Sequence, residues 1–248
     1  MSIRCCIFVD GENLRHSICD LFHGIFSAAD YLPKLADWAP LYDWLVYETV
    51  GAGGNRVRTY WYVVEQMDFF PYRPFPRDKD TQRKMLSRHA PYKTELDSLA
   101  GPARDTRIDG MLEELTNRHR TMRDRFDGWR KVQDGISLKH DAIEFRRAGA
   151  IRYNLFDRSL GDEKAVDVKL ATDLIVLKDV YDVAVIVSGD QDYVPAVQVL
   201  KDRGKRVINV AFQTRNGRLL PGGAKRLNHV TDKAFEVPYA DMKSHLKL

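Results

Sequence analysis

The sequence predicts an α/β protein in which a parallel sheet carries helices on both faces and an inserted basic helical lobe interrupts the sheet. Short apolar runs alternate with segments of helical spacing near both ends of the 248-residue chain, a pattern typical of parallel sheets. Residues 66–147 differ, because charged segments with helical spacing fill them. We therefore expect one domain built from residues 1–65 and 148–248, and a lobe formed by residues 66–147.

The first part of the chain contains two predicted strands with two helices between them. Ile3–Val9 is a short apolar run that Asp-Gly ends, which predicts a buried strand. Glu12–Phe22 and Trp38–Val50 are predicted helices, and a glycine-rich segment follows the second. Arg56–Val64 alternates apolar and polar residues, so we expect a second strand there.

The predicted lobe carries the basic excess of the chain. Between Arg73 and Arg152 there are 19 Lys+Arg and 13 Asp+Glu, whereas the rest of the chain has 20 and 22. Its longest predicted helix has an apolar stripe near the 3.6-residue period: Ile108, Met111, Leu112, Leu115, Met122, Phe126 and Trp129. Four arginines lie mostly beside this stripe: Arg118, Arg120, Arg123 and Arg125. They form either a nucleic-acid-binding surface or an ordinary solvated helix face.

After the lobe, the alternation of strands and helices resumes. The predicted strands are Ala150–Phe156, Val183–Val187 and Arg206–Ala211. The predicted helices are Glu163–Asp179 and Gln191–Arg203, and Gly204 ends the second. Both α/β portions are therefore expected to share one sheet.

Composition and motifs exclude several classes of protein. With 44% hydrophobic residues, 16 Gly and 10 Pro, the chain is neither disordered nor collagen-like. Its first apolar run is too short for a signal peptide, and no run approaches the roughly 18 residues of a membrane span, so we expect a soluble cytoplasmic protein with no membrane partner. Three cysteines without metal-site spacing predict neither a disulfide scaffold nor a zinc site. Nucleotide-cofactor and acyl-transfer motifs are missing too.

Carboxylates gather where the predicted strands end. Asp10 follows the first strand, and Asp190 and Asp192 follow the strand Val183–Val187. Ligand sites in open parallel sheets form outside these carboxyl ends. Asp167 lies in the first turn of a predicted helix, whose beginning belongs to the same edge, so the four groups are expected to share a cleft. Each alone also fits a structural role, as a turn or helix-start residue.

Three further polar residues accompany these carboxylates. The amide of Asn13 is expected to fix a carboxylate or a metal-bound water, and the hydroxyl of Ser188 is expected to do the same from a strand end. Asp173 lies further along the helix that contains Asp167 and either braces the site or is solvated.

Crowded carboxylates repel one another unless a cation holds them. Oxygen ligands suit Mg²⁺ or Mn²⁺, which retain bound waters. Such ions activate water and stabilise the charge that develops on a phosphodiester. The sequence therefore predicts metal-dependent hydrolysis of phosphodiester bonds.

Three sequence blocks resemble the signature blocks of NYN domains, which are PIN-like nucleases of the LabA type. The blocks are Ile7–Asn13, Ala165–Asp173 and Val185–Tyr193. The resemblance covers about residues 1–65 and 148–238, and it implies a PIN-like Rossmannoid fold, Mg²⁺ or Mn²⁺, and endonucleolytic cleavage of RNA. Matched by position, the metal ligands would be Asp10, Asp167, Asp190 and Asp192, with Asn13 beside them. Asp173 matches a recurrent acid, and the lobe matches no motif.

The leading hypothesis is a metal-dependent endoribonuclease. Its acidic cleft cuts RNA, single-stranded or structured, and its basic lobe holds the strand through phosphate contacts and aromatic stacking. DNA is an alternative substrate. The first alternative function is a non-catalytic nucleic-acid-binding or regulatory NYN module. The second is a small-nucleotide phosphohydrolase that uses the same acids without the lobe.

Overall fold

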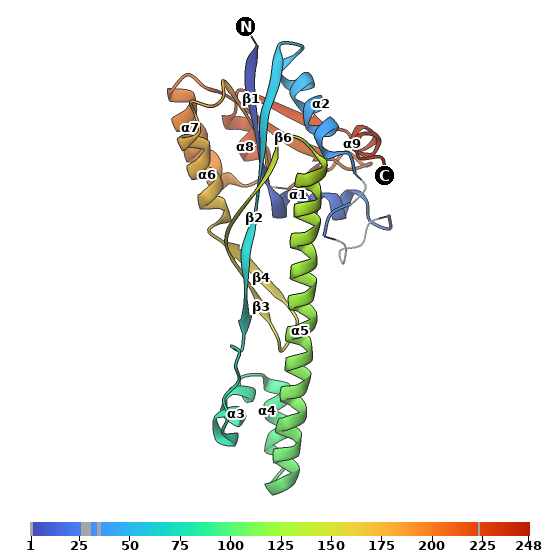
Figure 1. Cartoon of the computed structure of the whole chain (residues 1–248), viewed down its shortest axis with the longest axis vertical. Coiled ribbons are helices and arrows are strands. Elements are labelled where there is room, and N and C mark those ends of the chain that lie inside the picture. Colours follow the sequence, from blue (N-terminus) through green and yellow to red (C-terminus); the bar gives the residue numbers. More distant parts are fainter. Residues whose placement is uncertain (1, 26–30, 34–35, 223) are drawn as a thin grey trace. The chain divides into compact units, whose positions relative to one another are not determined.

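The computed structural model describes residues 2–25, 31–33, 36–222 and 224–248, and it has the α/β architecture predicted from the sequence (Figure 1). The chain divides into two compact units. The first comprises Met1–Val63, Trp129–Ala148 and Ala165–Leu248, and the second comprises Val64–Gly128 and Gly149–Lys164. Residues 129–147, expected in the lobe, thus cluster with the first unit, and residues 149–164 cluster with the second.

The centre of the first unit is a mostly parallel sheet. Strand β1 (Ile3–Asp10) pairs in parallel with β2 (Gly54–Phe70) on one side and with β5 (Val183–Val187) on the other, and β5 pairs in parallel with β6 (Arg206–Gln213). The strand order is β4-β3-β2-β1-β5-β6-β7, and β8 also pairs with β6. Both β1 and β5 are almost wholly buried, as apolar runs without alternation predict.

Helices cover both faces of this sheet. Figure 1 shows α6 (Val166–Val176) and α7 (Val194–Asp202) on one side of the strands and α2 (Trp38–Val50) and α9 (Tyr239–Leu246) on the other. The remaining helical elements of the described first unit are α1 (Gly11–Leu21), η1 (Gln191–Tyr193), α8 (Ala224–Val230) and the end of α5 (Gly101–Lys139) from Trp129 onward. The two-sided cover explains why β1 carries apolar side chains from Cys5 to Val9 and β5 carries them throughout.

The second unit contains helices and an antiparallel hairpin. Its helices are α3 (Lys79–Leu86), α4 (Ala90–Asp97) and the larger part of α5 (Gly101–Lys139). The end of β3 (Ile143–Asn154) pairs antiparallel with β4 (Leu160–Lys164). The predicted apolar stripe of α5 is buried from Ile108 to Phe126 except at Leu112, which is half-buried. No helix in the described ranges combines the length and the hydropathy that a membrane crossing needs.

The structure corrects the helix predicted over Glu163–Asp179. Glu163 pairs with Ile151 and Lys164 pairs with Ala150 in the hairpin, so these residues are extended. Ala165, with a φ of 72°, separates β4 from α6. The strand predicted over Ala150–Phe156 begins earlier, at Ile143, and the strand predicted to end at Val64 continues to Phe70. The described chain also has β7 (Leu219–Leu220) and β8 (Lys233–Val237), which periodicity did not predict.

Candidate metal centre

The candidate site lies at the carboxyl ends of β1 and β5. Because β2 and β5 pair with opposite sides of β1, the strand order reverses there, which is where open parallel sheets place their ligand sites. Asp10 is the last residue of β1 and caps α1, since its carboxylate accepts a hydrogen bond of 3.1 Å from the backbone N–H of Asn13. Hydrogen bonds from Ser188 to Asp10 and from Gly189 to Asn13 place the turn after β5 beside the start of α1.

Two glycines permit close backbone contacts around this site. A Cβ at Gly11 would lie 2.3 Å from the carbonyl oxygen of Tyr62 and 2.8 Å from Cγ1 of Val63, so only glycine lets α1 begin directly against β2. A Cβ at Gly189 would lie 2.7 Å from Cβ of Pro221. The turn after β5 therefore packs tightly against the segment that precedes α8, and both contacts fix the backbone that carries the carboxylates.

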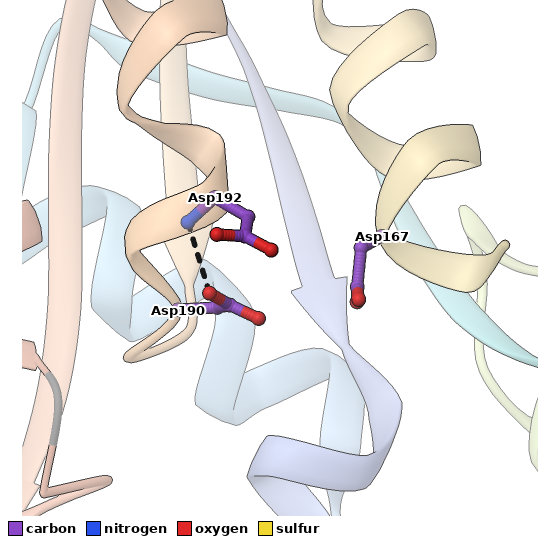
Figure 2. A group of neighbouring side chains, drawn as sticks. All are labelled: Asp167, Asp190 and Asp192. Carbon is purple, nitrogen blue, oxygen red and sulfur yellow. Dashed lines mark hydrogen bonds between the residues drawn. The ribbon is translucent and has the colours of Figure 1, made fainter. Parts of the chain in front are cut away.

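Three carboxylates come together at the site: Asp167, Asp190 and Asp192 (Figure 2). One oxygen of each lies within 4.8 Å of the others. Asp167 projects from the first turn of α6, whereas Asp190 and Asp192 come from the turn after β5 and from η1. Asp190 accepts a hydrogen bond of 2.9 Å from the backbone N–H of Asp192, which fixes the spacing of the pair.

The electrostatics of this acidic cluster favour a cation. Burial raises the pKa of Asp167 above its usual value, and the negative charges of Asp190 and Asp192 raise it further. Asp167 and Asp190 are half-buried and Asp192 is exposed, so an ion would retain access to solvent. Three carboxylate oxygens with room for water are the donor set that Mg²⁺ and Mn²⁺ prefer, and the residues therefore fit such an ion.

Asp10 lies outside this group of three and is completely buried. Its Oδ2 accepts hydrogen bonds from Nδ2 of Asn13 at 2.6 Å, from the hydroxyl of Ser188 at 2.9 Å and from the hydroxyl of Tyr193 at 3.1 Å. Burial raises the pKa of Asp10 to about 6, and the negative charge of Asp167 adds to the rise, although the hydrogen bonds oppose it. Asp10 is therefore the centre of a buried hydrogen-bond network that adjoins the three carboxylates.

Asn13 and Ser188 connect Asp10 to the turn after β5. The Oδ1 atom of Asn13 accepts a hydrogen bond of 3.4 Å from the backbone N–H of Gly189. The hydroxyl of Ser188 donates to Asp10 and accepts a hydrogen bond of 3.0 Å from the backbone N–H of Asp190. Both side chains thus position the turn that carries Asp190.

Tyr193 is a site residue that the reasoning from strand ends missed. It is completely buried, and its hydroxyl lies 3.1 Å from Oδ2 of Asp10 and 3.2 Å from Oδ1 of Asp167. Burial and the two carboxylates raise its pKa, so the phenol stays protonated. A hydroxyl-bearing aromatic directly after Asp192 was the available signal in the sequence.

Asp173 has different partners from the other acids. Its carboxylate accepts hydrogen bonds from Nη1 of Arg146 at 2.5 Å, Nζ of Lys169 at 2.9 Å and the hydroxyl of Tyr62 at 3.0 Å. Burial raises its pKa, but these hydrogen bonds outweigh burial, and the net result is a lowered pKa. Asp173 is buried, so of its two expected roles the solvated one does not apply, and it braces α6 against β2 and β3.

The four arginines of α5 divide into two kinds. Nη1 of Arg118 donates hydrogen bonds of 2.9 Å and 2.8 Å to the carbonyl oxygens of Leu155 and Phe156, which ties this side chain to the second unit's own backbone. The other three, Arg120, Arg123 and Arg125, are exposed. Arg120 and Arg123 line a hollow of about 640 Å³ together with Arg73.

The chain is similar to known proteins at the level of family. The family model for the NYN domain matches residues 94–232, a range that includes Asp167, Asp190 and Asp192 and leaves Asp10 and Asn13 outside it. A crystal structure of a protein of unknown function from Vibrio parahaemolyticus is similar at 13% identity and a TM-score of 0.45, over 95% of this chain and 93% of that chain. No curated protein matches the sequence.

Proposed function

The chain belongs to the NYN family of PIN-like nucleases, and from this premise we propose that it is a metal-dependent endoribonuclease whose metal ligands are Asp167, Asp190 and Asp192. The observation that carries the proposal is the convergence of these three carboxylates from α6 and the turn after β5. When bound, Mg²⁺ or Mn²⁺ would activate a water and neutralise charge on the phosphodiester during in-line attack.

The protein's own contribution is to hold the carboxylates in place. Tyr193 links Asp167 to the buried Asp10, and Ser188 links Asp10 to the backbone of Asp190. Because these supporting groups are buried and hydrogen-bonded, the ligand oxygens need little reorganisation when an ion binds. Asp10 and Asn13 therefore act in this proposal through the position of the ligands.

RNA is the proposed substrate because the second unit offers exposed basic side chains. Arg120 and Arg123 are exposed, and no hydrogen bond or ion pair of their side chains occurs among the described residues. The chain's excess of positive charge also lies in this part of the sequence. Exposed arginines that are not engaged by acids are suited to phosphate contacts. A small-nucleotide phosphohydrolase would not need this surface.

The test is an RNA cleavage assay with the full chain. End-labelled single-stranded RNA, structured RNA and DNA of the same sequence are incubated with Mg²⁺, Mn²⁺ or EDTA. We expect internal cleavage of RNA with either ion, and none in EDTA or with Asp190→Asn. Asp202→Asn is the matched control, because Asp202 is an exposed acid at the end of α7, and it should cleave normally.

Each contrary result selects another function. RNA binding without cleavage under any metal condition would make the chain a non-catalytic binding module. Hydrolysis of mononucleotides alone would make it a small-nucleotide phosphohydrolase. Cleavage that survives both EDTA and Asp190→Asn would remove the acidic cluster from the mechanism.

A further inference from the structure

A pocket of about 470 Å³ lies in the second unit, lined by α5 and by the hairpin of β3 and β4. Helix α5 supplies Arg118, Met122 and Arg125, and the hairpin supplies Tyr153 and Arg158. We call it the Arg158 pocket. Its volume lies within the range of about 300–1,000 Å³ that is usual for small-molecule sites.

The pocket combines an apolar, aromatic lining with a charged one. Met122 and Tyr153 are 4% and 8% exposed, so their side chains form part of the floor. The Tyr153 ring meets the Phe69 ring edge-on at 6.1 Å between centroids, which holds the tyrosine in place. A fixed aromatic ring beside a flexible thioether is a surface suited to a planar, apolar ring such as a nucleobase.

Positive charge exceeds negative charge around this floor. Three arginines line the pocket, and Glu114 is the acid among its lining residues. The Glu114 carboxylate accepts hydrogen bonds from Arg107 at 3.0 Å and from the hydroxyl of Tyr92 at 3.1 Å, and it lies 3.8 Å from Nη2 of Arg118. One carboxylate is thus shared by two arginines, Arg107 and Arg118, and Arg158 is not one of them.

The turn between β3 and β4 presents Arg158 to solvent. Arg158 has a φ of 63°, in the left-handed region that residues other than glycine rarely adopt. The neighbouring Asp157 accepts hydrogen bonds from Asn154 at 3.0 Å and from the backbone N–H of Ser159 at 2.9 Å. The negative charge beside Arg158 therefore stabilises the turn, and the exposed Arg158 side chain makes no hydrogen bond or ion pair within the described ranges.

We infer that the Arg158 pocket binds one nucleotide unit of the RNA strand, with the phosphate on Arg158 and the base against Met122 and Tyr153. This inference rests on the proposed function, since it identifies where the same substrate is held. Arginine recognises phosphate through charge-assisted hydrogen bonds, and stacking on an aromatic ring tolerates any base. The pocket would therefore bind a single strand without discriminating between base sequences.

The inference is tested by binding without cleavage. A fluorescent single-stranded RNA of ten nucleotides is titrated with the full chain in EDTA at several salt concentrations. For Arg158→Gln we expect weaker binding and a slope of log affinity against log salt that falls by about 0.7, the value for one phosphate contact on a single strand. Arg152→Gln is the matched control, because Arg152 is exposed on β3 and does not line the pocket, and it should change neither quantity as much.

The base contact is tested with Tyr153→Leu. Loss of one stacked base should weaken binding by at least about fivefold. Because Tyr153 is buried, the thermal melting curve of Tyr153→Leu is measured beside that of Arg158→Gln. Arg158 is exposed, so the Arg158→Gln variant should melt like the wild type. Unchanged affinity and salt slope in Arg158→Gln overturn the inference, and so does an equal loss in Arg152→Gln.

A second arm distinguishes the source of the nucleotide, with uridine and adenosine monophosphates as probes. Arg158-dependent binding of the RNA with weak mononucleotide binding supports the strand. Tight, Arg158-dependent binding of the monophosphates without RNA binding overturns the strand as the ligand. Cleavage assays keep the two proposals separate. Arg158-dependent binding without any cleavage refutes the nuclease alone, whereas metal-dependent cleavage with Arg158-independent binding refutes the pocket alone.

Discussion

The hydroxyl of Tyr193 lies 3.1 Å from Oδ2 of Asp10, and both residues are completely buried. The same hydroxyl is 3.2 Å from Oδ1 of Asp167. A phenol has one proton, so it can donate to only one of these carboxylates at a time. Tyr193 therefore couples the state of the buried Asp10 to that of Asp167 in the acidic cluster.

Removal of this hydroxyl should weaken the cluster without unfolding the protein. Tyr193→Phe takes a donor from both carboxylates, and we expect a 10–100-fold loss of metal affinity or of kcat, the order typical for groups that orient metal ligands. Tyr181→Phe is the matched control, because Tyr181 is equally buried and its hydroxyl donates to the carbonyl of Leu174. Manganese titration and cleavage kinetics measure both effects. Equal losses in the two variants would show that packing, rather than the contact with the carboxylates, is responsible.

Asp10→Asn should remove a pH-dependent loss of stability from the metal-free protein. The pKa of Asp10 is raised to about 6 from 3.8, so the folded state binds this proton more tightly than the unfolded state. The corresponding stability is fully present below pH 3.8 and is lost as the pH rises through about 6. A pKa shift of this size lowers the free energy of unfolding of the wild type by about 2–3 kcal/mol as the pH rises. Asparagine does not titrate, so the variant does not undergo this loss.

Urea unfolding in EDTA at pH 5 and pH 8 measures this effect. The free energy of unfolding of Asp10→Asn, relative to that of the wild type, should be higher at pH 8 than at pH 5. A difference that stays constant between the two pH values would mean that Asp10 does not titrate as its burial requires.

Asp167 and Asp173 should fail in different ways although they lie on one helix. Asp167→Asn and Asp190→Asn each remove a charge from the acidic cluster, so we expect Mn²⁺ binding and cleavage to be lost while the protein melts normally. Asp173→Asn removes the partner of Arg146 and Lys169 and should cost about 2–4 kcal/mol of stability. Calorimetric Mn²⁺ titration and thermal melting of each variant separate the two roles. Loss of metal binding in Asp173→Asn at unchanged stability would reverse the assignment.

The sheet could be predicted from the sequence because its strands are buried on both faces. Val183–Val187 is a strand with the predicted bounds, and Trp38–Val50 is a helix with the predicted bounds. The hairpin could not be predicted in the same way, because β4 is mostly exposed and reads Leu-Gly-Asp-Glu-Lys, without alternation. Glu163 and Lys164 favour a helix locally, and their pairing with β3 overrides that preference.

The positions of the strand ends predicted where the carboxylates gather. They did not predict which of these carboxylates form the acidic cluster and which one lies outside it. Asp167, Asp190 and Asp192 meet, whereas Asp10 lies outside the group and accepts hydrogen bonds from four donor atoms. Spacing along the chain gives the position of a carboxylate, but two of the residues that donate to Asp10, Ser188 and Tyr193, are far away from it in the sequence. Tyr193, 183 residues after Asp10, is such a donor.

Gly11→Ala should damage the site through the backbone. Its Cβ would meet the carbonyl oxygen of Tyr62, which belongs to a strand of the sheet and cannot easily move. We expect a loss of about 1–3 kcal/mol or more from overpacking, together with weaker Mn²⁺ binding as Asp10 shifts. Gly53→Ala is the control, because a Cβ there would meet nothing within 4 Å. Melting and Mn²⁺ titration of both variants provide the comparison, and equal behaviour would show that α1 does not depend on this close approach.

The arginines of α5 should separate into a binding pair and a structural residue. Arg120 and Arg123 are exposed, so the double change Arg120→Gln and Arg123→Gln should leave melting unchanged and lower the slope of log affinity against log salt by about 1.4, at about 0.7 for each phosphate contact. Arg118→Gln removes two hydrogen bonds to the carbonyls of Leu155 and Phe156, so it should cost about 1–3 kcal/mol of stability. RNA titrations in EDTA at two salt concentrations, beside melting curves, measure both effects. An unchanged slope in the double variant would leave these two arginines as a solvated helix face and would strengthen small-nucleotide hydrolysis as the function.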